Sequence, residues 1–70
     1  MKNDVLVRFG SRVRELRKKK GLSQEALALE AGLDRSYIGG VERGERNISL
    51  ENMTKLARAI GIHPSKFLQD

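Results

Sequence analysis

The stretch "SQEALALEAGLDRSYIGGVER", residues 23–43, decides how this chain is expected to fold. It has the pattern of two short helices joined by about three residues around a glycine, Gly32. Ser23 and Asp34 are favourable N-cap residues, and each stands directly before one of the two helices. The stretch therefore predicts a helix-turn-helix.

The side chains inside this stretch also match what the packing of such a motif demands. Ala28, four residues after Gln24, is small at the point where the two helices cross closely. Gly32 suits a connecting residue in the left-handed conformation, which a side chain would strain. Ile38 and Val41 share one face and attach the second helix to the first. Together these positions favour a helix-turn-helix over an arbitrary pair of helices.

Apolar residues at helical spacing predict further helices on both sides of the motif. In chain order they are Leu6, Phe9, Val13, Leu16, Leu50, Met53, Leu56, Ala57 and Ile60. We expect the first helix to end at Gly21, and the fourth to begin after Ser49 and end at Gly61.

A short fifth helix is predicted from Pro64, because proline suits the first helical position. It should place Phe67 and Leu68 inward, and His63 before it should be a capping or surface residue. The expected fold is thus all-α, a compact five-helix domain over residues 1–70 with the helix-turn-helix at about 23–43.

The composition narrows the class of function. Fourteen Lys and Arg against nine Asp and Glu give a net charge of +5, which favours a nucleic acid or an acidic membrane surface as partner, unless the charge serves solubility alone. Since cysteine is absent, Met1 begins no signal peptide and no apolar run could span a bilayer, we expect a cytoplasmic protein without membrane contact. One histidine and no carboxylate cluster argue against an enzyme, a cofactor or a metal site.

Nearly the whole chain resembles the Cro/repressor-type helix-turn-helix regulators, whose DNA-binding domains are lambda-repressor-like. Residues 21–62, "GLSQEALALEAGLDRSYIGGVERGERNISLENMTKLARAIGI", are especially similar to the small controller proteins of bacterial restriction–modification systems. The resemblance implies a homodimeric transcriptional regulator that binds a near-palindromic operator in double-stranded DNA near its own gene and the endonuclease gene. RNA polymerase is a further candidate partner. The alternative function is an antitoxin or another protein-interaction module on the same scaffold.

The resemblance also assigns roles to individual residues. Arg35 and Ser36 match the positions that read bases from the start of the recognition helix. The positions that match contacts to the DNA backbone or a nearby base are Gln24, Tyr37, Arg43, Arg46 and Asn47. Lys20 is added as a phosphate candidate from the basic run at residues 8–20. Tyr37 has an alternative role, covering the edge of the domain. Arg17 and Glu42 match a structural ion pair beneath the motif.

The adjacent glycines Gly39 and Gly40 are unusual inside a helix, since each costs about 0.5–1 kcal/mol relative to alanine. If Ile38 points inward, Gly40 points outward and Gly39 lies on the flank. We expect the pair to thin this face so that the backbone can approach DNA closely. Two alternatives are packing against another element of the same chain and a neutral role.

Apolar residues near the last two helices are the candidates for the contact between the two protomers. They are Ile48, Ile62 and Phe67.

Overall fold

The computed structural model of the protein describes residues 4–69, so residues 1–3 and 70 of the expected domain lie outside the described part. Within it the chain forms α1 (Asp4–Lys20), α2 (Gln24–Ala31), α3 (Arg35–Glu42), α4 (Leu50–Ile60) and the short 3-10 helix η1 (Pro64–Leu68). The expected all-α fold is confirmed. The chain follows the expected order of five helical segments, with the difference that the fifth is a short 3-10 helix.

The ends of the helices follow from local side chains. The hydroxyl of Ser23 accepts a hydrogen bond from the Ala26 N–H, which confirms it as the N-cap of α2. Gly32 then ends α2 in the left-handed conformation, with φ of 70°. Asp34 occupies the N-cap position of α3, yet its side chain makes no capping hydrogen bond. Asp34 is therefore the N-cap of α3 by position, as predicted, but its side chain does not contribute to the cap.

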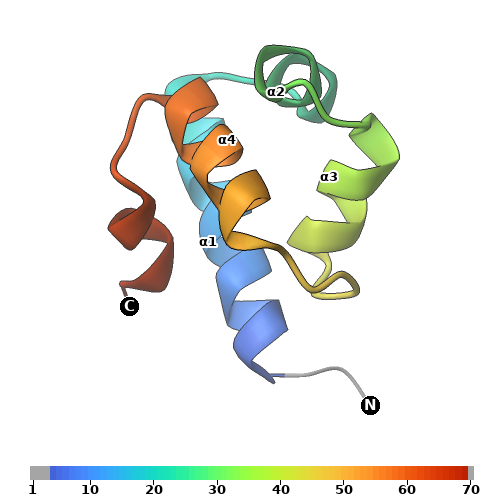
Figure 1. The fold of residues 1–70 in the computed structure, drawn as a ribbon, viewed down its shortest axis with the longest axis vertical. Coiled ribbons are helices and arrows are strands. Elements are labelled where there is room, and N and C mark those ends of the chain that lie inside the picture. Colours follow the sequence, from blue (N-terminus) through green and yellow to red (C-terminus); the bar gives the residue numbers. More distant parts are fainter. Residues whose placement is uncertain (1–3, 70) are drawn as a thin grey trace.

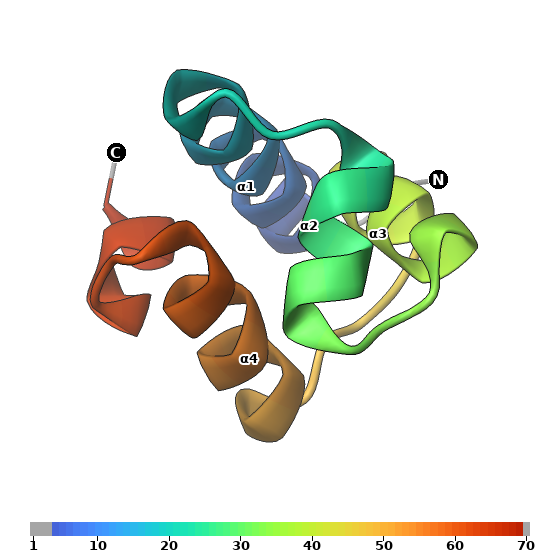
Figure 2. The same ribbon diagram turned by 90° about the horizontal axis from the view of Figure 1, so that it is seen from above.

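One apolar core joins all five elements. Figure 2 shows α4 and η1 on one side of the molecule and α2 and α3 on the other, and Figure 1 agrees. The buried apolar side chains are Phe9, Val13, Leu16, Leu27, Ala28, Ile38, Val41, Leu56, Ala57, Ile60 and Phe67. Because Ile38 and Val41 belong to this core, the inner face of α3 is held against the body and its other face is turned outward.

The last segment docks through one aromatic ring. Phe67 is 2% exposed and meets Phe9 edge to face, with the ring centroids 5.5 Å apart. Leu68 is 69% exposed, so the expectation that it points inward is wrong. A 3-10 helix turns about 120° per residue, so the residue after Phe67 leaves the core direction.

The contact between α1 and α3 depends on a glycine that the sequence patterns did not single out. Gly10 is buried, and a Cβ added there would lie 2.8 Å from the carbonyl oxygen of Glu42. The two helices therefore meet through their backbones, with no room for a side chain. No helix in the described range 4–69 has both the length and the apolar character needed to cross a membrane.

Candidate nucleic-acid interface

The candidate interface is the outward face of α3, which runs along the edge of the molecule in Figure 1. Arg35 and Ser36, in the first turn of this helix, are both exposed. A guanidinium group can donate two hydrogen bonds to guanine, and a hydroxyl can donate or accept. The two side chains predicted to read bases thus have the chemistry and the accessibility that the role requires.

A buried ion pair lies under this face and links α1 to α3. Arg17 donates from Nε to Oε2 of Glu42 at 2.6 Å and from Nη2 to Oε1 at 3.0 Å. The two residues are only 7% and 8% exposed. The remaining Nη1 of Arg17 donates to the carbonyl oxygen of Leu22 at 2.8 Å, directly before α2. This bidentate pair therefore ties α1, the start of the motif and α3 together.

Gln24 takes part in the same network. Its amide nitrogen donates to Oε1 of Glu42 at 3.0 Å, and the residue is half-buried. The side chain of Gln24 thus points toward α3. The resemblance had implied a contact of Gln24 with the DNA backbone or a nearby base. Among residues 4–69, no buried side-chain nitrogen or oxygen lacks a hydrogen-bond partner.

The glycine pair of α3 is covered by arginine side chains. Gly39 and Gly40 are both buried. A Cβ at Gly39 would lie 3.0 Å from Nη1 of Arg43, and one at Gly40 would lie 2.8 Å from Cγ of Arg46. Contrary to the expectation that Gly40 points freely outward, arginine side chains cover both glycines in the free protein, and the close approach to DNA stays a prediction. The absence of two side chains leaves space that the long stems of the following arginines fill.

Tyr37 connects α3 to α4 and also supports one of these arginines. Its hydroxyl accepts a hydrogen bond from the amide nitrogen of Asn52 at 3.1 Å. The guanidinium carbon of Arg46 lies 5.9 Å from the centroid of the Tyr37 ring, within the range of a cation–π contact. Tyr37 thus joins α3 to α4 and supports Arg46, and its two expected roles, contact with the DNA backbone and cover of the domain edge, both stay predictions.

Two further predicted DNA contacts lie at the margins of this face. Asn47 is exposed in the loop after α3. Lys20 is exposed at the end of α1, and its Nζ lies 3.8 Å from where a Cβ of Gly61 would be. Gly61 is the C-cap of α4, where helix carbonyl groups attract a cation. The structure therefore places the Lys20 ammonium beside the end of α4.

Two arginines of the outward face have acidic neighbours that the sequence patterns did not mark as functional. Arg43 donates from Nε to Oε1 of Glu45 at 3.0 Å. Nε of Arg35 lies 3.9 Å from Oε1 of Glu25, which belongs to α2. All four side chains are largely exposed.

The three candidate dimer contacts differ in how far they are buried. Phe67 packs against Phe9 in the core of its own protomer and is 2% exposed, but it also lines the apolar groove beside η1, so its part in a dimer contact stays a prediction. Ile48 and Ile62 are half-buried. An apolar groove of about 400 Å³ opens where α1 and α4 begin beside η1. Its apolar lining includes Val5, Ile48, Leu50, Met53, Phe67 and Leu68, and Arg8, Asn47 and Gln69 also border it. Val5, Leu50 and Leu68 are 71%, 78% and 69% exposed.

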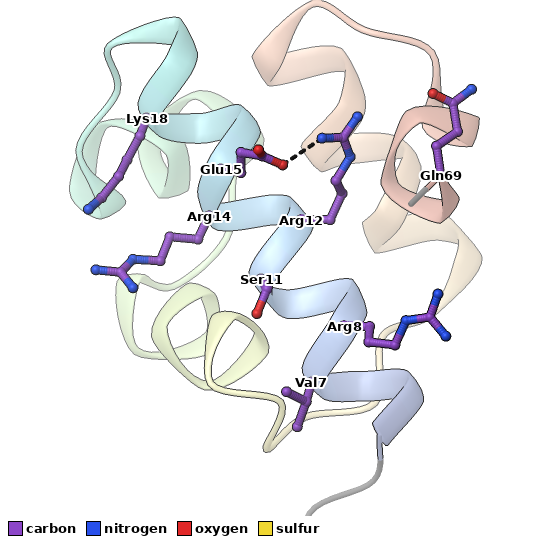
Figure 3. Close-up of a pocket in the computed structure, with 8 residues that line it drawn as sticks. All are labelled: Val7, Arg8, Ser11, Arg12, Arg14, Glu15, Lys18 and Gln69. Carbon is purple, nitrogen blue, oxygen red and sulfur yellow. Dashed lines mark hydrogen bonds and ion pairs between the residues drawn. The ribbon is translucent and has the colours of Figure 1, made fainter.

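The outer side of α1 is a second, basic surface (Figure 3). The side chains of Arg14 and Lys18 extend to one side of the helix, while those of Arg8 and Arg12 extend to the other. Arg12 is paired with Glu15 and donates to the carbonyl oxygen of Lys66 at 3.0 Å. These cations diverge and do not converge on one point. The described chain also holds no group of three His, Cys, Asp or Glu residues that could bind a metal ion.

Comparison with known proteins gives consistent matches along the chain. The family model described as "Helix-turn-helix" matches residues 13–67. Control protein C.BamHI of Bacillus amyloliquefaciens is 45% identical over 69 residues, which are 97% of this chain and 85% of that protein. Control protein C.MunI of Mycoplasma sp is 44% identical over 69 residues, 97% of this chain and 93% of that protein.

Solved structures agree with these sequence matches. The restriction–modification controller protein C.AhdI from Aeromonas hydrophila superposes with a TM-score of 0.87 at 64% identity, over 89% of this chain and 94% of that one. The wild-type controller protein C.Esp1396I also gives a TM-score of 0.87, at 28% identity over 96% of this chain and 88% of that one.

Proposed function

Since the chain belongs to the helix-turn-helix family of transcriptional regulators, we propose that it is the homodimeric controller protein of a restriction–modification system. It binds a near-palindromic operator beside its own gene and the endonuclease gene. One observation carries this proposal. Arg35 and Ser36 are exposed on α3, and the buried Arg17–Glu42 pair holds that helix in place.

In this proposal Arg35 and Ser36 read base edges in the major groove, and the surrounding residues hold the DNA backbone. Arg43, Arg46 and Asn47 supply backbone contacts from the end of α3 and the following loop. Gln24 contributes through the N–H that is not bound to Glu42, while Lys20 reaches a phosphate only if it leaves the end of α4.

The homodimer follows from the size of the reading surface. One short recognition helix contacts too few base pairs for specificity, and a second half-site about 34 Å away supplies the rest. The apolar groove at Val5, Leu50 and Leu68 is the surface we assign to the protomer contact, with Ile48 at its margin. Large apolar side chains that are this exposed in one patch favour burial against a partner.

The protein acts in the cytoplasm, has no catalytic activity and meets RNA polymerase at the promoter that its operator overlaps. The described residues offer no cluster of groups for a metal, and the one histidine, His63, accepts a hydrogen bond from the Ser65 N–H as a helix cap.

A footprint on the DNA upstream of the gene tests this function. We expect two protected half-sites about one helical turn apart. A dimer that makes six to ten phosphate contacts should also lose roughly 10³–10⁵ in affinity between 50 and 200 mM salt. No protection together with nearly flat salt dependence would overturn the proposal. Co-purification with a toxin in place of DNA binding would favour the antitoxin alternative.

A further inference from the structure

The outward arginines of α3 are not free cations in the unbound protein. Arg43 is hydrogen-bonded to Glu45 at 3.0 Å, and Arg35 lies 3.9 Å from Glu25. The two acids come from different elements, Glu45 from the turn after α3 and Glu25 from the first turn of α2. Acidic side chains thus flank the candidate reading surface on two sides.

Fold stability accounts for only a small part of the presence of these two acids, since Glu25 in the first turn of α2 gains a modest contribution from the helix dipole and Glu45 lies outside the helices. Both pairs are exposed, and exposed ion pairs contribute little to stability because solvent screens them. The buried network of Arg17, Gln24 and Glu42 already ties α1, α2 and α3 together. A chain that binds a polyanion also gains nothing in affinity from two carboxylates at the binding face.

The acids have a consequence for the choice between DNA sequences. A carboxylate at this face repels phosphates wherever the protein lands, and each arginine must leave its carboxylate before it binds DNA. A bidentate contact with guanine compensates for the lost arginine–carboxylate interaction. A single phosphate contact on a random sequence compensates for less of it. Repulsion of this kind lowers affinity for the wrong partner more than for the right one.

We propose that Glu25 and Glu45 are specificity-determining residues, which suppress binding to non-operator DNA by pairing with Arg35 and Arg43 in the free protein. The inference rests on the proposed DNA-binding function. In it, the two acids lower the affinity for non-operator DNA and make no contact with the operator.

The test compares Glu25→Gln and Glu45→Gln with a matched control in the same chain. Glu15→Gln removes the same charge from another exposed Arg–Glu pair, with Arg12 on the outer face of α1 (Figure 3). The probes are a duplex selected from a random pool by the unchanged protein and a scrambled duplex of equal length and base composition. Binding is measured by fluorescence anisotropy at one fixed salt concentration, and a thermal melt verifies that each variant is folded.

We expect each test variant to bind the scrambled duplex about 3–10-fold more tightly and the selected duplex less than about 2-fold more tightly. The ratio of the two dissociation constants should therefore fall. Glu15→Gln should leave that ratio unchanged. If Glu25→Gln and Glu45→Gln also leave it unchanged, the inference is wrong while the proposed function stands. If the unchanged protein selects no sequence at all, the proposed function itself fails.

Discussion

Arg17 and Glu42 lie 25 residues apart in the sequence and form two side-chain hydrogen bonds inside the protein, at 2.6 and 3.0 Å. Within residues 4–69, Glu42 is the acid whose carboxylate neutralises the buried guanidinium of Arg17. The pair lies directly beneath the recognition helix, so its loss should affect the fold before it affects the DNA surface.

Replacing Glu42 with alanine should destabilise the protein by about 3–5 kcal/mol, because it leaves Arg17 buried without a counter-charge. Chemical denaturation of the single variant measures this. Glu15→Ala, which breaks an exposed pair with Arg12, should cost less than about 1 kcal/mol. A loss of similar size in both variants would contradict the role assigned to the buried pair.

Gly10→Ala should destabilise the protein by about 1–3 kcal/mol or more, although alanine is the better helix former. The added methyl group would meet backbone atoms of α3, which cannot move aside as a side chain can. Ser11→Ala, at the next and exposed position of α1, is the control and should change stability by less than about 0.5 kcal/mol. Urea denaturation measures the free energy of unfolding of both variants. If that of Gly10→Ala is unchanged, α1 and α3 do not meet through their backbones as described.

The two glycines of α3 should respond differently to alanine. Gly39→Ala should stabilise the protein by about 0.5–1 kcal/mol, since only the flexible end of Arg43 must move. Gly40→Ala should gain less, because its methyl group displaces the stem of Arg46 from its place beside Tyr37. Operator binding should therefore weaken more in Gly40→Ala. Thermal melts and gel-shift titrations measure the two effects, and equal behaviour of the variants would contradict this account.

Arg35→Ala should cost about 1–3 kcal/mol on the operator and relax the preference at one base position. Arg46→Ala should weaken binding about equally on all sequences, because a phosphate contact carries no sequence information. Titrations on the selected and scrambled duplexes separate the two outcomes. If both variants lose the same factor on both duplexes, Arg35 is not a base reader.

Leu50→Asp should convert the dimer to a monomer without unfolding it, since Leu50 is 78% exposed in the apolar groove. Leu29→Asp is the matched control, because Leu29 is 84% exposed on α2 and lies outside that groove. Analytical ultracentrifugation at tens of micromolar reports the mass of each. A Leu50→Asp variant that remains dimeric would show that the protomers meet elsewhere.

The sequence predicted those features of the fold that depend on neighbouring residues. Ser23 and Ser49 cap their helices, and Gly32 and Gly61 end theirs in the left-handed conformation, because each effect acts within one helical turn. Both apolar residues of the last segment were predicted to point inward, and only Phe67 does. The segment has five residues, which is too short for helical periodicity to tell the two positions apart.

Features that depend on distant segments were beyond the sequence patterns. The link between Arg17 and Glu42 came from resemblance to a family, since nothing in their spacing marks them as partners. The burial of Gly39 and Gly40 depends on how the side chains of Arg43 and Arg46 fold back, which helical periodicity does not describe. Gly10 carried no visible signal, because its role lies in a crossing with a helix some thirty residues later.

The backbone contact at Gly10 also means that the residues that hold α3 in place are different from the residues that α3 exposes. Since α1 holds this helix at its carbonyl groups and at Glu42, the position of the helix does not depend on the side chains that it displays outward. If Arg35 and Ser36 read bases as proposed, replacing them should change the preferred DNA sequence and leave the fold intact. On the proposed function, one scaffold of this kind can therefore serve different operators through changes confined to the exposed residues of α3.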